Sequence, residues 1–555
     1  MTKKAPYIIT GALSAALFYV FYGFRVLDPL YVDWLLSGGD LSQHYLGWAL
    51  YRNSPFKLNF GLTNALAYPF STSIVFTDSI PLMAVPCKII GRFTYVQFQY
   101  FGIWALLCIV LMGLLTCFLL NRYIDDPVVL VFSSLLTTIS PCMFKRIFWH
   151  TSLGAHFLII LGLILIVYRN ELCDTLKHTI MWWSLTGFLC SFIHIYFLAM
   201  NAVFLLCFIC FRIIDLKRKS GSVFSDHDHL KVVSVICAPV SYFVTAALSV
   251  WLLGGFSSGM NSGAPGLNYY SFNLNSFFNP QGWSVILPDL PYYADGQYEG
   301  FAYLGFGMLT AVIIAIVTGL LAFRRNMYFI KRCIPYILCV FILIFFIIIM
   351  SESNEITFGS RLLFSVKIPD GLRNSWEIFR SCGRLVWPAV YIICLITHVI
   401  LFRSMRPVFA ASLLVLCLFL QLFDLRNIIE LKHSEFAGQA FYTHRLNDKL
   451  INSIADDKDL KHIVFLDKDN LTQEELYSFA EFAARKRLTI NDFYFARSLN
   501  HPVNEAALDF FMHPSEDTLY VISDESYEMR YMFDLSYYKY GDLSLGLKSP
   551  LNVDS

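Results

Sequence analysis

The chain has 555 residues, of which 56% are hydrophobic, 17% aromatic and only 15% charged. Soluble domains average about half apolar and a quarter charged residues, so this composition, with a mean hydropathy of +0.55, excludes a soluble protein and indicates a polytopic membrane protein. The net charge of +1 comes with basic residues in short clusters rather than in a stripe, so we expect no nucleic-acid partner.

Apolar stretches close to the length that crosses a bilayer as a helix recur along the chain. They predict about eleven spans, at residues 7–24, 98–120, 127–143, 150–168, 178–193, 195–214, 232–254, 301–323, 333–350, 386–402 and 407–423. The first has no small-residue cleavage site, so we expect it to stay in the membrane. The 14 cysteines are scattered singly without metal-knuckle spacing, and we interpret them as small hydrophobic residues.

Basic loops indicate the orientation of the chain, because they stay on the cytoplasmic side. With the N-terminus inside, the cytoplasmic loops contain Lys3, Lys4, Arg122, Arg169, Lys177, Arg212, Lys217, Arg218, Lys219, Arg324, Arg325, Lys331, Arg332, Arg403 and Arg406. Segments 25–97, 255–300 and 351–385 then lie outside, together with the C-terminal region. The fold class is therefore an α-helical polytopic membrane domain over residues 1–424 and a small outer α/β domain over 425–555. All cytoplasmic connections are short, so we expect the chemistry on the outer face.

The first outer segment concentrates polar side chains just after the first span. Gly38 and Gly39 let the backbone turn sharply before Asp40. Apolar residues at helical spacing over 42–51, followed by Pro55, predict a short helix lying along the membrane surface. A carboxylate there is well placed to meet the head group of a lipid substrate, so Asp40 is a candidate catalytic residue.

Other side chains of this segment are candidate substrate ligands. Gln43 and His44 follow Asp40 by about one helical turn, and Arg52 lies at the end of the predicted helix. Trp34 and Trp48 need no ligand, because aromatic residues gather at membrane interfaces in any case. Asp78 is a second acid, placed just before the chain returns toward the membrane; it is a candidate catalytic group or, equally, the N-cap of a helix.

Cations and histidines also fall on the outer boundary. Lys145 and Arg146, with His150, occupy the turn between the third and fourth spans, against the usual preference for cations inside. A bound anion explains them, and so does snorkelling toward lipid head groups. His194 lies between the fifth and sixth spans, where a structural hydrogen bond is the commoner role of a single histidine.

Two further outer segments carry candidate ligands. Segment 255–300 is rich in glycine, serine and asparagine and ends in Tyr298 and Glu299, a composition suited to a mobile sugar-binding loop but common in loops generally. In segment 351–385, Arg380 and Arg384 are spaced to share one face of a helix. Paired guanidinium groups suit a phosphate, while Glu377 or a lipid phosphate offers a structural alternative.

The C-terminal region has the composition of a soluble domain. Helical patterns cover 435–454 and 472–485, and strand patterns cover 462–466, 489–495 and 518–522. No glycine-rich phosphate loop, Ser-His-Asp arrangement or metal spacing occurs there. We therefore expect this domain to bind an acceptor or to pack against the outer loops.

Several short strings carry a family resemblance. They are Gly39-Asp40-Leu-Ser-Gln43-His44-Tyr-Leu-Gly47-Trp48, Asp78-Ser79-Ile-Pro81-Leu82, His194-Ile-Tyr196, Tyr298-Glu299-Gly300 and Phe379-Arg380-Ser-Cys-Gly383-Arg384. With the topology, residues 1–425 resemble the GT-C superfamily of membrane glycosyltransferases, including the bacterial O-antigen-modifying glucosyltransferases. The first loop has no Asp-x-Asp or Glu-x-Asp pair, so no cofactor is assigned and dependence on a divalent metal stays open.

The resemblance implies transfer of a sugar from a polyprenyl-phosphate donor to a glycan or lipid-linked glycan acceptor, with inversion, at the outer face of the bacterial inner membrane among its lipids. Asp40 is then the base that takes the acceptor proton, with Asp78 in reserve. A flippase or transporter of lipid-linked sugars is one alternative. A membrane acyltransferase using His150, His156 or His194 is another.

Overall fold

The structure is a computed structural model that describes residues 4–94, 96–220, 229–257, 259, 266–457, 459–495, 497, 499 and 501–551. It forms two compact units. The first comprises residues 1–26, 101–247 and 263–438, and the second comprises 27–100, 248–262 and 439–555. The sequence analysis divides the chain once, at residue 424. The structure instead groups the first outer segment with the C-terminal region.

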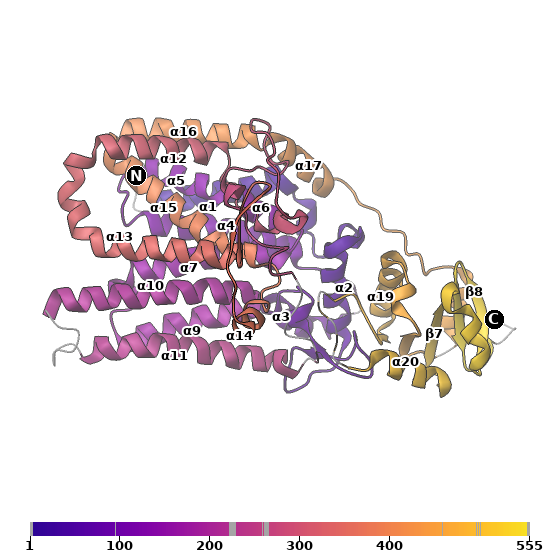
Figure 1. The fold of residues 1–555 in the computed structure, drawn as a ribbon. Helices are drawn as coiled ribbons and strands as arrows, with labels where there is room; N and C mark the ends of the chain where they lie inside the picture. Colours follow the sequence, from indigo (N-terminus) through magenta and orange to yellow (C-terminus); the bar gives the residue numbers. More distant parts are fainter. Residues whose placement is uncertain are drawn as a thin grey trace. The chain divides into compact units, whose positions relative to one another are not determined.

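The first unit is built from long apolar helices, and each predicted span coincides with one of them (Figure 1). They are α1 (Ala5–Tyr22), α4 (Phe101–Leu120), α5 (Pro127–Thr138), α7 (Phe157–Val167), α9 (Leu176–Ile193), α10 (Ile195–Ser220), α11 (His229–Leu252), α12 (Phe306–Leu321), α13 (Phe323–Glu352), α15 (Trp387–Ser404) and α16 (Pro407–Asp424). Among the described residues, 8 helical stretches are long and apolar enough to cross a membrane. The chain is thus a multi-pass membrane protein, and the predicted spans at 150–168 and 301–323 correspond to shorter apolar helices.

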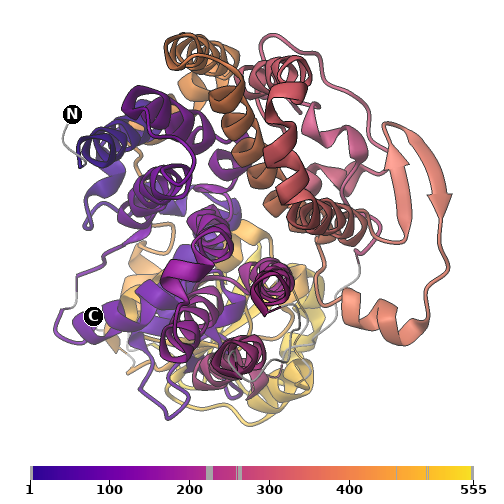
Figure 2. The same ribbon diagram turned by 90° about the vertical axis from the view of Figure 1, so that its left-hand side faces the viewer.

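Polar caps and short connections set the ends of these helices. Asp126 precedes α5 and accepts hydrogen bonds from the backbone of Val128 and Val129, while Pro127 takes the first helical position. Figure 2 views most of the helices of this unit end-on. Short helices join long ones at α6 (Pro141–Arg146) and α8 (Arg169–Leu172), and α17 (Arg426–Ala437) follows the last long helix.

The polar connections of the first unit are ordered by buried amide groups. Residues 266–305 contain the 3-10 turns η7 (Leu274–Phe277) and η8 (Asp295–Gly300), and after α13 come the hairpin β3 (Glu355–Phe358) and β4 (Arg361–Ser365), α14 (Asp370–Trp376) and the turn η9 (Cys382–Val386). Gln297 Nε2 donates to Thr357 Oγ1 over 2.9 Å, and its Oε1 accepts from Asn273 over 2.9 Å. The expectation of a mobile loop is therefore wrong for residues 266–300, because buried hydrogen bonds hold them in place.

The second unit combines the first outer segment with the C-terminal domain. Its N-terminal part contains the turn η2 (Asp33–Leu36), α2 (Gly39–Asn53), the strand pair β1 (Leu62–Thr63) and β2 (Thr72–Ser73), and α3 (Pro81–Gly91). Its C-terminal part is a sheet of order β6-β5-β7-β9-β8, formed by β5 (His462–Phe465), β6 (Thr489–Ile490), β7 (Thr518–Ser523), β8 (Ser536–Tyr540) and β9 (Leu543–Leu547). β5 is parallel to β6 and β7, and β9 is antiparallel to β7 and β8. The helices are α18 (Lys449–Asp457), α19 (Gln473–Lys486) and α20 (Val503–Met512).

Most predicted elements of the C-terminal region are present. The strands expected at 462–466 and 518–522 and the helix at 472–485 match β5, β7 and α19, and Thr472 and Glu475 form a capping box at the start of α19. Two differ from the prediction. The strand at 489–495 covers only Thr489–Ile490, and the helix at 435–454 is divided into the end of α17 and the start of α18.

Helix α2 forms as predicted and ends at Asn53, before Pro55, but it does not lie on a surface. All its residues from Leu41 to Arg52 are buried. Asn53 Nδ2 donates to the backbone oxygen of Ala484 in α19 over 2.7 Å, and the backbone of Ile490 in β6 exchanges bonds with Ala65 and Tyr68. The C-terminal domain thus covers α2, and Trp34 and Trp48 are core residues, a burial that the sequence did not predict.

Candidate active site

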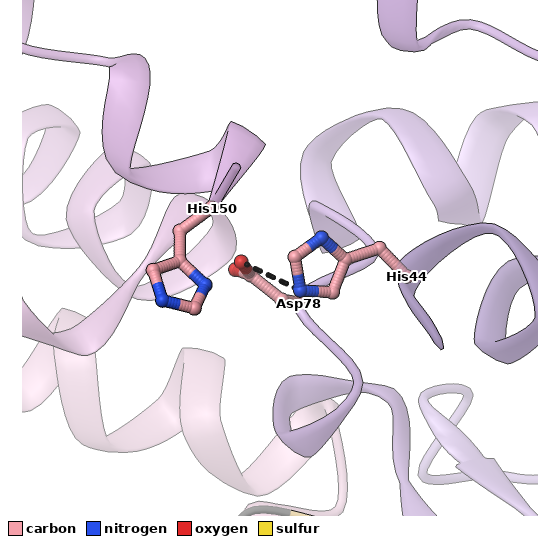
Figure 3. A group of neighbouring side chains, drawn as sticks. All are labelled: His44, Asp78 and His150. Carbon is pink, nitrogen blue, oxygen red and sulfur yellow. Dashed lines mark ion pairs between the residues drawn. The ribbon is translucent and has the colours of Figure 1, made fainter. Parts of the chain in front are cut away.

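In the second unit, the partly buried Asp78 forms an acid–imidazole pair with the buried His44. His44 Nε2 lies 3.3 Å from Asp78 Oδ2, and Figure 3 shows the ring and the carboxylate facing each other. Asp78 has a left-handed backbone with a φ of 53°, which costs free energy in a residue that is not glycine. The N-cap of α3 is Ile80, so the capping alternative for Asp78 is not realised.

The backbone beside this pair is held close to α2. Ser79 Oγ donates to the carbonyl oxygen of His44 over 2.9 Å. A Cβ atom at Gly47, one turn further along α2, would lie 2.7 Å from Thr77 Cβ, so only glycine permits this approach. The close packing of Thr77 and Ser79 on α2 therefore positions Asp78 against His44.

Burial determines the charge state of His44. It lowers the pKa of His44 from 6.5 to about 4, and the neighbouring Asp40 carboxylate opposes this shift only in part. The imidazole is therefore neutral at neutral pH. A neutral ring can donate one hydrogen bond to Asp78 and so fix the orientation of its carboxylate without neutralising it.

Asp40 lies in the first turn of α2. Gly38 and Gly39 precede it with φ values of 104° and 62°, so the sharp turn expected from this pair is confirmed. Asp40 is half-buried, and a carboxylate in this position is stabilised by the helix dipole whether or not it is catalytic. Its charge adds to the effect of burial in raising the pKa of Tyr477 on α19.

Gln43 and Arg52, the two other candidates on α2, form hydrogen bonds within the second unit. Gln43 Nε2 donates to the backbone oxygen of Tyr494 over 2.8 Å, which ties α2 to the C-terminal domain. Arg52 is buried, donates to the backbone oxygen of Thr94 over 2.8 Å and lies over the ring of Phe98. These contacts give both side chains a packing role within the second unit.

In the first unit, Glu299 joins two arginines in a buried group that we call the arginine triad (Arg146, Glu299 and Arg384). Glu299 Oε2 lies 2.8 Å from Arg146 Nη2 and 2.8 Å from Arg384 Nε. Burial by itself would raise the pKa of Glu299, but the charges of Arg146 and Arg384 outweigh it and hold the pKa well below its usual value. Two cations and one ionised acid leave the triad with one net positive charge.

Close backbone packing brings η8 and η9 together. A Cβ atom at Gly383 would lie 2.7 Å from the Cα atom of Gly300 and equally close to the backbone of Ser271. Because Gly383 and Gly300 are neighbours in sequence of Arg384 and Glu299, this approach sets the separation of the ion pair.

Lys145 and His150 surround the triad. Lys145 Nζ donates to Gln281 Oε1 over 2.9 Å and to the backbone oxygen of Tyr298 over 3.4 Å. His150 Nε2 lies 4.0 Å from Glu299 Oε1. The structure thus brings together the candidates Lys145, Arg146, His150, Tyr298, Glu299 and Arg384, which are scattered over about 240 positions of sequence.

Arg380 belongs to the same region but has a different partner. Its Nη2 atom donates to the hydroxyl of Tyr270 over 3.1 Å, and its guanidinium carbon lies 4.9 Å from the centre of that ring. The prediction that Arg380 and Arg384 share a helix face is wrong: α14 ends at Trp376 and the next turn, η9, begins at Cys382. Arg373, not Arg380, pairs with Glu377.

The remaining histidines have structural surroundings. His194 ends α9, and its Nδ1 atom accepts a hydrogen bond from the backbone of Tyr196 over 3.2 Å. His156 is fully buried, with Nδ1 at 2.6 Å from Tyr391 Oη. Sequence reasoning missed Tyr196, whose hydroxyl accepts from the backbone of Ser381 over 2.9 Å and anchors the arginine-bearing segment.

An apolar cavity of about 300 Å³ lies in the first unit. Its walls come from α10, α11 and α13, for example Leu206, Phe243 and Phe346. Phe379, Leu385 and Pro388 close it, so the segment that carries Arg380 and Arg384 also forms one wall of the cavity.

Comparisons with known proteins identify the family. A family model described as a domain of unknown function, DUF6311, matches residues 11–426, and the model of the DUF6311 C-terminal domain matches residues 452–545. The chain belongs to this family. The two DUF6311 models thus cover both the membrane helices and the C-terminal sheet. No curated protein matches the sequence.

Two solved structures resemble the DUF6311 chain over its length. One is the crystal structure of ArnT from Cupriavidus metallidurans bound to undecaprenyl phosphate, with 11% identity, a TM-score of 0.45 and 99% of each chain covered. The other is the archaeal oligosaccharyltransferase AglB from Archaeoglobus fulgidus in complex with an inhibitory peptide and a dolichol-phosphate, with 12% identity, a TM-score of 0.45, and 100% of this chain and 75% of that chain covered. At this level of similarity, neither structure assigns a function to the DUF6311 chain.

Proposed function

We propose that this chain is a membrane glycosyltransferase that moves a sugar from a polyprenyl-phosphate donor to a glycan acceptor on the outer face of the bacterial inner membrane. The observation that carries the proposal is the apolar cavity closed by Phe379, Leu385 and Pro388. An isoprenoid tail needs an apolar channel, and its phosphate needs cations where the channel ends. Here the segment that lines the cavity with Phe379, Leu385 and Pro388 also carries Arg380 and Arg384.

The charge of the arginine triad supports an anionic ligand. Its two guanidinium groups outnumber its one carboxylate, and guanidinium groups are the side chains best suited to bind a phosphate. Arg146 Nη1 is buried and has no hydrogen-bond partner within the described part of the chain. Arg380, half-buried and held by Tyr270, offers a further guanidinium group outside the triad.

The acids of the second unit are the proposed source of the base. The acceptor hydroxyl oxygen attacks the anomeric carbon, and the bond from that carbon to the phosphate oxygen breaks, with its electron pair leaving on the polyprenyl phosphate. The hydroxyl proton passes to a carboxylate. Asp40 is the candidate drawn from sequence; the buried neutral His44 partner and the strained backbone favour Asp78 as an equal candidate.

Two of the three histidines considered for an acyltransferase, His156 and His194, have surroundings that speak against that role, and the third, His150, lies 4.0 Å from Glu299. His156 is buried among membrane helices against Tyr391, and the side chain of His194 accepts a local backbone hydrogen bond. Neither arrangement resembles a base aimed at a substrate, which needs access to a reacting group.

The test is the fate of a radiolabelled polyprenyl-phosphate hexose added to the purified protein in proteoliposomes with a glycan acceptor. We expect the label to appear on the acceptor and polyprenyl phosphate to be released. Movement of the intact donor across the bilayer without transfer would establish a flippase instead. An unchanged donor across a panel of sugars and acceptors would overturn the proposal.

A further inference from the structure

A second pocket in the first unit combines aromatic rings with unused polar atoms. It has a volume of about 320 Å³, at the lower end of the range for small-molecule sites, and is separate in its lining from the apolar cavity. Its walls are formed by Lys145, Trp149, Gln281, Trp283, Asp289, Leu290, Tyr292 and Tyr298. Trp149 and Tyr298 are 41% and 36% exposed, and their rings are nearly parallel, with centres 6.4 Å apart.

The orientation of the Gln281 amide follows from its neighbour. Lys145 can only donate hydrogen bonds, so the amide atom at 2.9 Å from its ammonium group must be the oxygen. The amide nitrogen of Gln281 is then the free end; it is buried and has no hydrogen-bond partner among the described residues. Gln281 also has a φ of 51°, a strained backbone of the kind found at ligand sites.

An acceptor group faces the same pocket. Asp289 Oδ1 accepts a hydrogen bond from the backbone nitrogen of Gly282 over 2.6 Å, which holds the carboxylate beside Gln281. That bond uses one of the two carboxylate oxygens. The pocket therefore offers an amide donor, a carboxylate acceptor and several aromatic faces, with Trp283 almost fully buried beneath them.

We propose that Gln281, Trp283, Asp289 and Tyr298 form a binding site for one neutral pyranose ring. A sugar ring has hydroxyl groups that both donate and accept hydrogen bonds, and faces of C–H groups that pack on aromatic rings. A phosphate would be repelled by Asp289, and an aromatic belt at the membrane interface needs neither the buried amide nor the acid. This inference rests on the proposed glycosyltransferase function and assigns a binding site to the sugar of one of its substrates.

Sugar binding is testable without any transfer reaction. Saturation-transfer NMR on the purified full chain in nanodiscs, with methyl glucoside, galactoside and mannoside at millimolar concentration, should give signals on the ring protons of at least one of them. Gln281→Ala and Tyr298→Ala should reduce those signals at least fivefold. Tyr293→Ala is the matched control, because Tyr293 is a 42% exposed neighbour that does not line the pocket, and it should bind like the wild type.

The outcomes separate this site from the proposed function. Binding that is lost in the pocket variants establishes the site even if no transfer activity is found. Absence of signals for all three sugars, or equal signals in wild type and pocket variants, overturns the site, including where transfer from a polyprenyl-phosphate donor is observed. Thermal unfolding of each variant within about 2 °C of the wild type shows that the fold is intact.

Discussion

Single side chains carry most of the proposed chemistry, and the structure changes which of them stand out. Asp78 was expected to be a cap or a reserve acid, but its partner is the buried, neutral His44. Asp40 follows the sharp glycine turn that was expected and lies at the N-terminus of α2. Gln43 and Arg52 are bonded to the backbone of the same unit, so their substrate-binding role loses support.

We predict that the catalytic base is revealed by replacing each acid with its amide. Loss of a general base lowers the rate by about a hundred- to ten-thousand-fold, because the acceptor hydroxyl then keeps its proton in the transition state. Asp78→Asn or Asp40→Asn should show this loss in turnover of the radiolabelled donor, while the variant protein accumulates in the membrane as the wild type does. Asp33→Asn, in the same outer segment, is the control. Full turnover in both Asp40 and Asp78 variants would exclude these acids as the base.

Arg380 is predicted to bind the donor phosphate. Arg380→Ala should raise the KM for the polyprenyl-phosphate donor about tenfold or more, and Arg380→Lys should raise it less, because lysine keeps the charge but loses the planar fork of donors. Arg373→Ala provides the comparison, since the side chain of Arg373 is 56% exposed and pairs with Glu377. A wild-type donor KM in Arg380→Ala would remove this residue from the site.

His44 should make the protein sensitive to acid. The ordinary pKa of 6.5 applies to the unfolded chain, and burial lowers the pKa of His44 in the folded chain to about 4. Between these values the unfolded chain binds a proton that the folded chain does not, so the stability present above pH 6.5 falls as the pH is lowered from 6.5 toward 4. Tm measured from pH 7.5 to 4.5 should fall less steeply for His44→Gln than for wild type. If Tm falls equally steeply with pH in wild type and His44→Gln, the lowered pKa of His44 is contradicted.

At the scale of elements, the turns η8 and η9 make the donor end of the proposed site. Their glycines let the backbones approach, and the ion pair of Glu299 and Arg384 joins them. The regular elements serve mainly as supports: α10, α11 and α13 shape the apolar cavity, and α2 carries Asp40 and His44. Of the proposed site residues, Glu299 and Arg384 thus lie on irregular segments held by rigid helices, whereas Asp40 and His44 lie on a helix.

Gly383→Ala should damage this arrangement. The added methyl group would lie 2.7 Å from Gly300, and forcing an extra carbon into such packing costs about 1–3 kcal/mol. We expect a lower Tm and weaker donor binding. Gly371→Ala is the matched control, because a Cβ atom there meets nothing within 4 Å. Equal effects of the two substitutions would show that the close approach of η8 and η9 is unimportant.

At the scale of the whole molecule, the chain forms two compact units. The first has the apolar cavity and the arginine triad, and the second has Asp40 and Asp78, with α19 of the C-terminal domain packed on α2. This packing explains why a soluble-like domain follows the membrane helices: it covers a segment that would otherwise expose its core. The proposed orientation places the second unit outside the cytoplasm.

Topology reporters test that orientation. A reporter that is active only outside the cytoplasm should work when fused after Ser555 and fail when fused after Lys219 or Arg332, because basic loops remain inside. Reporter activity of all three fusions is measured in intact cells, with immunoblots to correct for the amount of each fusion. The reverse pattern would place the acids and the arginine triad on the cytoplasmic side and contradict the proposed reaction.

The sequence by itself determined the class of protein, the helices and most strands of the C-terminal sheet. These features depend on local patterns: apolar stretches long enough to span a bilayer, and alternation or capping signals such as Thr472 before α19. The polar candidates were found for a related reason, since ionisable side chains at the edges of apolar stretches are conspicuous.

Only the tertiary structure decided how those candidates are partnered. Arg146 and Glu299 are 153 residues apart, and Gln43 and Tyr494 are 451 apart, so no periodicity relates them. The burial of α2 depends on a C-terminal domain that a local pattern does not include. Pairing and burial are set by which surfaces meet in space, because an ion pair or a packed ring depends on distance and not on order in the chain.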